Sequence, residues 1–208
     1  MCATVITPDY WEHACQHLVR RDRVMKKLIP RFGEARLVNR GDAFTTLARS
    51  VVGQQISVKA AQTLWGRLAG ALGETHYLLL PGRLTQTEPA ALRSLGLSAR
   101  KAEYLLDLAA HFQHGTVHVA QWQAMDDEAI IDELVAIRGI GRWTAEMFLI
   151  FYLMRPNVLP LDDVGLIKGI SQLYFSGEPV SRAEARELGE GWAPYRSVAT
   201  WYLWRSLD

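Results

Sequence analysis

Apolar residues recur at the three- and four-residue spacing of helices along most of the chain. Two segments, 75–80 and 116–122, have some β character, but neither has a hairpin partner with suitable turn chemistry. No low-complexity linker or obvious internal repeat divides the sequence. We therefore predict an all-α fold. The supporting stripes are Phe44, Leu47, Val51 and Val52; Ala60, Ala61, Leu64 and Leu68; Tyr104, Leu105, Leu108, Ala109 and Phe112; and Ile130, Leu134 and Ile137.

Local sequences mark where several helices begin and end. Residues 87–89 (Thr-Glu-Pro) place a cap before an early-helix proline, and Ser181 with Glu184 is typical of a capping box. The apolar run 147–154 is too short to span a bilayer, and it predicts a helix buried on all sides. The Arg-Pro pair that follows is expected to end this helix.

Length and charge limit the possible classes of protein. With 208 residues the chain can bury one sizeable core, as one domain or as two small lobes that share their packing. The formal net charge is +1, which argues against long tracts of phosphate contacts. The 23 basic residues can still gather on one face. Binding to nucleic acid would therefore depend on backbone N–H groups and a few cations.

The cysteines exclude one kind of metal site. Cys2 and Cys15 cannot form a four-thiolate metal or iron–sulfur centre. The start of the chain also lacks an apolar run of signal-peptide length. A reducing cytoplasm, without membrane association, fits these features best.

The segment 134–145 places Gly139 and Gly141 around Ile140, between two apolar-patterned helices. Glycines there can adopt positive φ and allow another backbone to come close. The helix that follows would present unpaired N–H groups and the positive end of its dipole, which suits a phosphate. On this motif alone, a plain turn between two helices is the simpler interpretation. Residues 92–102 loosely repeat the pattern, either as an ordinary hairpin or as a functional duplication.

Two adjacent carboxylates, Asp162 and Asp163, follow Pro160 and precede a new helical pattern. An Asp directly before a helix is usually an N-cap. Of two such residues, one can cap the helix while the other faces a pocket. The helical pattern runs through Leu166, Ile167, Ile170 and Leu173.

Together these segments resemble the helix-hairpin-helix (HhH-GPD) DNA glycosylases, and within that superfamily the DNA-3-methyladenine glycosylase II group. The resemblance covers nearly the whole chain, and the hairpin followed by an Asp pair is its most specific part. It is carried by the hairpin 134–145, the Pro-rich turn, the Asp pair, the closing segment 195–204, the run 51–61 and the opening segment 9–33.

The resemblance implies a single HhH-GPD domain over residues 1–208 with two helical lobes. One lobe would hold the hairpin, at about 42–150, and the other would combine 1–41 with 155–208, with the active-site cleft between them. Some relatives carry an iron–sulfur loop or an N-terminal β domain, and this chain has neither the cysteines nor the length for them.

The resemblance places the catalytic carboxylate at Asp163 and leaves Asp162 as a structural neighbour that caps the helix. Cleavage of a bond from deoxyribose to a purine develops positive charge on the sugar, which a fixed carboxylate stabilises while it orients water. Trp143 stands where lyase-competent relatives carry a Schiff-base lysine. The resemblance thus implies a monofunctional enzyme that uses water and leaves an abasic site.

Trp143 and Trp204 match pocket-wall positions of the resembled glycosylases and could hold a cationic alkylated base between them. For either Trp alone, core packing is the alternative. Met147 and Val164 stand where that relative has aromatic residues, so the pocket would be roomier or less aromatic. Gln55 matches the residue that fills the gap left by a flipped nucleotide, unless it is an ordinary helix-end glutamine.

The resemblance also implies a partner and a function. We expect a cytoplasmic, nucleoid-associated monomer that removes 3-methyladenine and 7-methylguanine from double-stranded DNA in base excision repair, without a required cofactor. Two alternatives stay open: a glycosylase for deaminated or oxidised bases, and a non-catalytic hairpin module that only binds DNA. The implied DNA contacts are Ser57, Lys59, Gly139, Ile140, Gly141, Arg142 and Thr144, and the backbone carbonyls of Val135, Ile137 and Ile140 could hold a monovalent cation.

Overall fold

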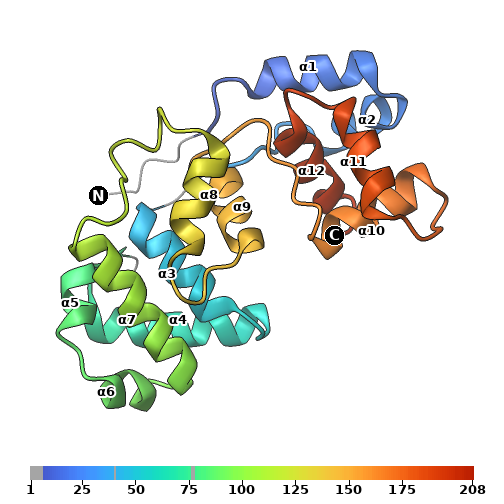
Figure 1. The fold of residues 1–208 in the computed structure, drawn as a ribbon. Coiled ribbons are helices and arrows are strands. Elements are labelled where there is room, and N and C mark those ends of the chain that lie inside the picture. The colour runs from blue at the N-terminus through green and yellow to red at the C-terminus, as the bar shows by residue number, and fades with distance from the viewer. Residues whose placement is uncertain (1–6, 40, 76–77) are drawn as a thin grey trace. The chain divides into compact units, whose positions relative to one another are not determined.

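The computed structural model describes residues 7–39, 41–75 and 78–208. This part of the chain is almost entirely helical (Figure 1), which confirms the all-α prediction. The elements are α1 (Trp11–Arg21), α2 (Arg23–Leu28), the 3₁₀ helix η1 (Ile29–Phe32), α3 (Ala43–Gly53), α4 (Val58–Leu72), β1 (Gly73–Thr75), β2 (Leu78–Leu79), α5 (Pro81–Thr85), α6 (Pro89–Ser94), α7 (Ala99–Gln113), α8 (Asp127–Val135), α9 (Arg142–Phe151), α10 (Val164–Tyr174), α11 (Arg182–Glu190) and α12 (Arg196–Arg205).

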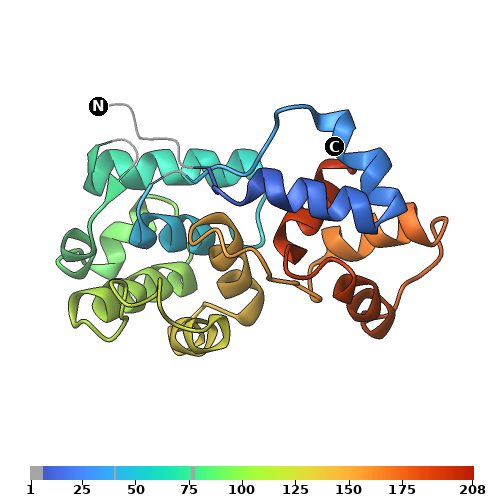
Figure 2. The same cartoon turned by 90° about the horizontal axis from the view of Figure 1, so that it is seen from above.

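The described residues divide into two compact units. The hairpin unit comprises residues 41–75 and 78–148, and the second unit comprises residues 7–39 and 149–208. In the hairpin unit α7 packs against α3, α5 and α6, and α4 packs against α3 (Figures 1 and 2). In the second unit α12 packs against α1 and α10, and α11 packs against α10. A segment near the start of the sequence and the C-terminal segment therefore build the second unit together.

The predicted apolar stripes supply part of the core of the hairpin unit. The stripes on α3, α7 and α8 are largely buried, with Leu47, Val51, Leu105, Leu108 and Leu134 fully inside. The stripe on α4 was only partly correct, because Leu68 is buried whereas the first turn of that helix is exposed.

One carboxylate, Asp22, ties the second unit together. Its Oδ1 accepts from the backbone N–H groups of Val24 (2.7 Å) and Met25 (2.9 Å) and so caps α2. Its Oδ2 accepts from the Tyr174 hydroxyl at 2.7 Å and from the Trp192 indole at 2.9 Å. Because these partners come from α2, α10 and the segment after α11, the bonds fix three parts of the unit to one side chain.

The helix boundaries confirm some predictions and correct others. Ser181 and Glu184 form the predicted capping box. α6 begins at Pro89 as expected, but no side chain caps it, and the Thr87 hydroxyl instead donates to the carbonyl of Arg83. The segment at 75–80 does contribute a strand, β2, which pairs antiparallel with β1. The prediction that this segment has no hairpin partner was therefore wrong.

The prediction that residues 147–154 form a helix buried on all sides was wrong. α9 runs from Arg142 to Phe151, so it begins earlier and ends before the Arg-Pro pair. Met154 has a φ of +53°, and the N–H of Arg155 donates to the carbonyl of Leu149 at 2.9 Å, so the chain has already left the helix there. Phe151 is 39% exposed, which shows that the last turn has an open side.

Both helix–glycine–helix segments fold as such. Gly96, between α6 and α7, has a φ of +107°, and Gly139, between α8 and α9, has a φ of +84°. None of the described helices is long and apolar enough to cross a membrane. Cys15 is a free, half-buried thiol, whereas Cys2 lies outside the described residues.

Candidate active site

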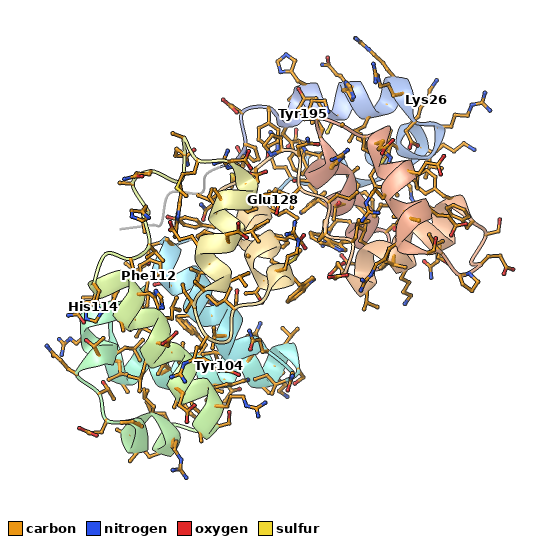
Figure 3. All side chains as sticks on the ribbon, viewed as in Figure 1. Lys26, Tyr104, Phe112, His114, Glu128 and Tyr195 are labelled. Carbon is orange, nitrogen blue, oxygen red and sulfur yellow. The ribbon has the colours of Figure 1, made fainter. Side chains whose placement is uncertain are left out.

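The hairpin between α8 and α9 depends on Gly139 for its shape. A Cβ at Gly139 would lie only 2.2 Å from Cδ2 of Tyr104, a residue of α7 that is labelled in Figure 3. Gly139 thus provides both a positive φ and a close approach, although the neighbour is an aromatic ring and not a backbone. A Cβ at Gly141 would meet nothing within 4 Å. The second glycine therefore leaves the start of α9 open to an approaching group.

The turn between α3 and α4 packs against the same hairpin. The Gln54 side chain donates from Nε2 to the carbonyl of Gly139 at 2.8 Å. Gln55 follows with a φ of +58°, a left-handed conformation that is uncommon outside glycine, and its side chain is exposed. Ser57 caps α4 by accepting from the N–H of Ala60 at 3.2 Å, and Lys59 is exposed in the first turn.

The structure brings four of the predicted site residues to one cavity of about 550 Å³ in the hairpin unit. Trp143 is 44% exposed, so core packing does not explain this indole. Met147 is half-buried and Thr144 is buried beside it. A cavity of this size suits a small planar ligand such as a base. Its wall consists of Ser50, Gly53, Gln54, Gln55, Trp143, Thr144 and Met147.

A second cavity, of about 430 Å³, lies along the hairpin backbone. It contains Val135, Ile137 and Ile140, whose carbonyls were expected to hold a cation. The carbonyl of Ile137 already accepts from the N–H of Ile140 at 3.1 Å. Lys101 also lines this cavity and donates from Nζ to the carbonyl of Val52 at 2.7 Å, and burial lowers the pKa of this lysine. Sequence reasoning did not find Lys101, whose only signal was its place in the weak repeat at 92–102.

Arg142, a predicted DNA contact, uses its guanidinium within the protein. Its two terminal nitrogens donate to the two carboxylate oxygens of Glu128, at 2.9 and 2.5 Å, and Nε donates to Glu146 at 3.1 Å. The hydrogen bonds from Arg142 lower the pKa of Glu128, and those to Glu128 raise the pKa of Arg142. Any contribution of Arg142 to an anion site therefore rests first on its backbone N–H in the opening turn of α9.

In the second unit, Asp163 is 9% exposed and is itself the N-cap of α10. Its Oδ1 accepts from the N–H of Leu166 at 2.6 Å and from Nε1 of Trp204 at 2.7 Å. The expectation that Asp162 caps this helix was wrong. Asp162 is exposed and forms an ion pair with Arg182 at 2.6 Å. Asp163 therefore combines the capping role with a contact to a predicted site residue.

Trp204 is stacked on Phe151, with ring centroids 5.5 Å apart and planes inclined by 13°. Phe151 was not predicted as a site residue, because its sequence shows only an apolar residue in an apolar run. Val164 is 81% exposed and lines a separate cavity of about 580 Å³ with Asp162, Ile167 and other residues. Neither Asp163 nor Trp204 is among the described residues that line it.

These groups suit a reaction that develops positive charge. A nearly buried carboxylate with fixed hydrogen bonds can stabilise a cationic transition state and orient water, because little reorganisation is needed as the charge appears. An exposed indole beside a cavity can contact an electron-poor ring by stacking and by cation–π attraction.

Comparisons with known proteins agree with this chemistry. The chain matches the family model of the HhH-GPD superfamily base excision DNA repair proteins over residues 48–194. A DNA-3-methyladenine glycosylase of Bacillus subtilis (strain 168) is 30% identical over 210 residues, which cover 97% of this chain and 67% of that protein.

Two solved structures are similar along almost the entire chain. The crystal structure of a DNA-3-methyladenine glycosidase from Bacillus halodurans has a TM-score of 0.86 and 35% identity, covering 98% of this chain and 92% of that one. The Schizosaccharomyces pombe 3-methyladenine DNA glycosylase, solved in complex with abasic DNA, has a TM-score of 0.83 and 30% identity, covering 93% of this chain and 96% of that one. The chain thus belongs to the HhH-GPD superfamily of base excision DNA repair proteins, among its DNA-3-methyladenine glycosylases.

Proposed function

We propose that this protein is a monofunctional DNA glycosylase that removes alkylated purines, 3-methyladenine and 7-methylguanine, from double-stranded DNA. It hydrolyses the N-glycosidic bond of a flipped nucleotide and leaves an abasic site for the later steps of base excision repair. The relatives are DNA-3-methyladenine glycosylases, which supports 3-methyladenine as a substrate, and the abasic DNA bound to the fission yeast enzyme supports DNA as the partner.

Asp163 is the group that acts on the sugar in this proposal. Alkylation at N3 or N7 makes the purine cationic and a good leaving group. The bond between C1′ and the purine therefore breaks with little further activation of the purine. The positive charge passes to the deoxyribose, where the carboxylate stabilises it and aligns a water for attack on C1′. The bond from C1′ to the base breaks, the bond from C1′ to the water oxygen forms, and the water proton leaves to the carboxylate or to solvent.

The residue Trp143 is the main support for a monofunctional enzyme, one without lyase activity. A lyase needs an amine that can form a Schiff base with C1′, and an indole cannot do so. None of the described side chains that line the cavity around Trp143 is an amine. The exposed indole instead offers a π face to a cationic base.

Gln55 supports the base-flipping part. Gln55, in a left-handed conformation, is exposed in the turn between α3 and α4 and lines the same cavity. A side chain held there can fill the gap in the duplex and offset the unstacking of the extruded nucleotide, which costs a few kcal/mol. The exposed Ser57 and Lys59 would add contacts to the nearby backbone, as would the amides of Gly141 and Thr144.

The hairpin carbonyls of Val135, Ile137 and Ile140 would hold a monovalent cation that helps to bind a DNA phosphate. The donor set fits, because carbonyl oxygens are hard ligands and the three residues line one cavity. Exchange of potassium for tetramethylammonium at constant ionic strength should then weaken binding to abasic-analogue DNA. Equal affinity in the two salts would remove the cation from the proposal.

Base release from four duplexes tests the substrate assignment. Each duplex carries one lesion: 3-methyladenine, 7-methylguanine, hypoxanthine or 8-oxoguanine. We expect release of the two methylpurines. Release of hypoxanthine or 8-oxoguanine without the methylpurines would instead identify a glycosylase for deaminated or oxidised bases.

Borohydride in the same reactions should trap no covalent enzyme–DNA adduct. A strong adduct would show that a lysine forms a Schiff base and that the monofunctional assignment is wrong. Binding of DNA with no release of any base would leave a non-catalytic hairpin module.

A further inference from the structure

Two glycines allow α10 and α12 to approach closely in the second unit. Gly165 and Gly169 are four residues apart on α10 and therefore share a face of that helix. A Cβ at Gly169 would lie 3.1 Å from both the Cβ and the carbonyl oxygen of Leu203. A Cβ at Gly165 would lie 3.0 Å from Cδ1 and 3.2 Å from Nε1 of Trp204. The approach of the two helices brings the pyrrole edge of the indole over the first turn of α10.

That edge meets the carboxylate that caps the helix. The indole N–H of Trp204 donates to Oδ1 of Asp163 at 2.7 Å, on the same oxygen that accepts from the N–H of Leu166. One capping bond alone would still allow the carboxylate plane to turn about the side-chain bond. Two donors from different helices on one oxygen fix that plane, and thereby fix the direction of the second oxygen.

The indole is itself held in place on the other side. Phe151, at the end of α9, stacks almost parallel on it, with centroids 5.5 Å apart. Trp204 thus has one face on Phe151, its pyrrole edge at Gly165 and its N–H on Asp163. These contacts describe a side chain whose orientation is set by the protein, as expected of a group that supports a catalytic residue.

We propose that Trp204 is a positioning residue, whose N–H orients the Asp163 carboxylate toward the reacting sugar. This inference rests on the proposed glycosylase function. It gives Trp204 the role of orienting Asp163, whereas the resemblance made it a wall of the pocket that holds the nucleobase. Loss of the N–H removes one of the donors that orient the carboxylate, so we expect the chemical step to slow while DNA binding is unchanged.

Trp204→Phe and Trp204→His separate the two roles. Phenylalanine keeps an aromatic wall that can stack on Phe151 but removes the donor. The five-membered ring of histidine corresponds to the pyrrole half of indole, with Nε2 in the place of Nε1, so it restores an N–H while it loses the larger aromatic surface. Trp201→Phe is the matched control, because Trp201 is on the same helix and packs edge-to-face on Trp11 and Tyr202.

The assay is the single-turnover release of 7-methylguanine, with affinity for duplex DNA containing a tetrahydrofuran abasic analogue measured in parallel. We expect Trp204→Phe to slow release about tenfold to a hundredfold, the range for loss of one hydrogen bond to a charged group, with affinity unchanged. Trp204→His should recover much of that loss, and Trp201→Phe should release the base at close to the wild-type rate. Gly165→Ala should slow release as well, because its Cβ would lie 3.0 Å from Cδ1 of Trp204 and 3.1 Å from Oδ1 of Asp163 and so crowds both partners of the hydrogen bond.

Trp204→Phe with a wild-type rate, or Trp204→His slower than Trp204→Phe, would overturn the positioning role and favour a wall for the base. Asp163→Asn, measured in the same assay, distinguishes a failure of the positioning role from a failure of the proposed function. If Asp163→Asn releases the base normally, the catalytic assignment itself fails. If it is inactive while Trp204→Phe is unaffected, only the present inference fails.

Discussion

Substitution of Gly139 by alanine tests how the hairpin is built. The residue has a φ of +84°, and its Cβ would lie 2.2 Å from Cδ2 and 2.4 Å from Cγ of Tyr104. Neither problem can relax alone. Turning the backbone would move the carbonyl that accepts from Gln54, and moving the ring would disturb α7.

The expected loss of stability is the sum of the conformational cost and the packing cost. A left-handed conformation costs an alanine about 1–2 kcal/mol. Insertion of a methyl group against an aromatic ring in a packed site costs about 1–3 kcal/mol. We therefore expect Gly139→Ala to lower the free energy of unfolding by about 2–5 kcal/mol, a large part of the total of a typical domain.

Gly141→Ala is the control, because its Cβ would meet nothing within 4 Å. We expect a loss of less than about 1 kcal/mol in stability, from the helix start alone. Its affinity for abasic-analogue DNA should nevertheless fall, since the methyl group would stand where a phosphate approaches the first amides of α9. Urea unfolding followed by tryptophan fluorescence and a DNA titration measure the two effects. Equal stability of the two variants would refute the assignment of separate roles to the two glycines.

Three further predictions concern other parts of the molecule. Asp163→Asn should abolish base release and leave affinity for abasic-analogue DNA largely intact, as measured by single-turnover kinetics and anisotropy. Gln55→Gly should keep the stability, because glycine tolerates the φ of +58°, but should slow release by about tenfold through loss of the filling side chain. Burial raises the pKa of Glu133, but hydrogen bonds from His118 and Trp122 outweigh it and lower the pKa overall. Glu133 therefore stabilises the fold above its ordinary pKa of 4.5 and loses this effect as pH falls, so Glu133→Gln should differ most from wild type near neutral pH in urea melts.

The all-α fold was predictable because its signals are local. Stripes such as that of Leu105 and Leu108 report helix and buried face together, and the capping box at Ser181 needs only four consecutive residues. The hairpin could be located from its glycines for the same reason. What the sequence did not distinguish was their separate roles, since the need for glycine at 139 comes from Tyr104, which is 35 residues away on another helix.

The site was less predictable wherever a side chain finds its partner through tertiary packing. Two adjacent Asp residues do not reveal which one caps α10, because that depends on the backbone conformation of the turn. Likewise, Arg142 reads as a free cation near a phosphate site until Glu128 and Glu146 are seen to bind it. Phe151 gave no signal at all, because an exposed aromatic at the end of an apolar run looks like the rest of the run.

The missing side chain at Gly165 also has a consequence for the evolution of the family. An extra carbon at this position would fill the gap through which the indole of Trp204 reaches the acid. The residues at positions 165 and 204 should therefore covary among related sequences. A descendant that gains a methyl group at the first would have no use for tryptophan at the second, and would need another donor for its carboxylate. Such paired replacement can be looked for in related genes without any protein being made.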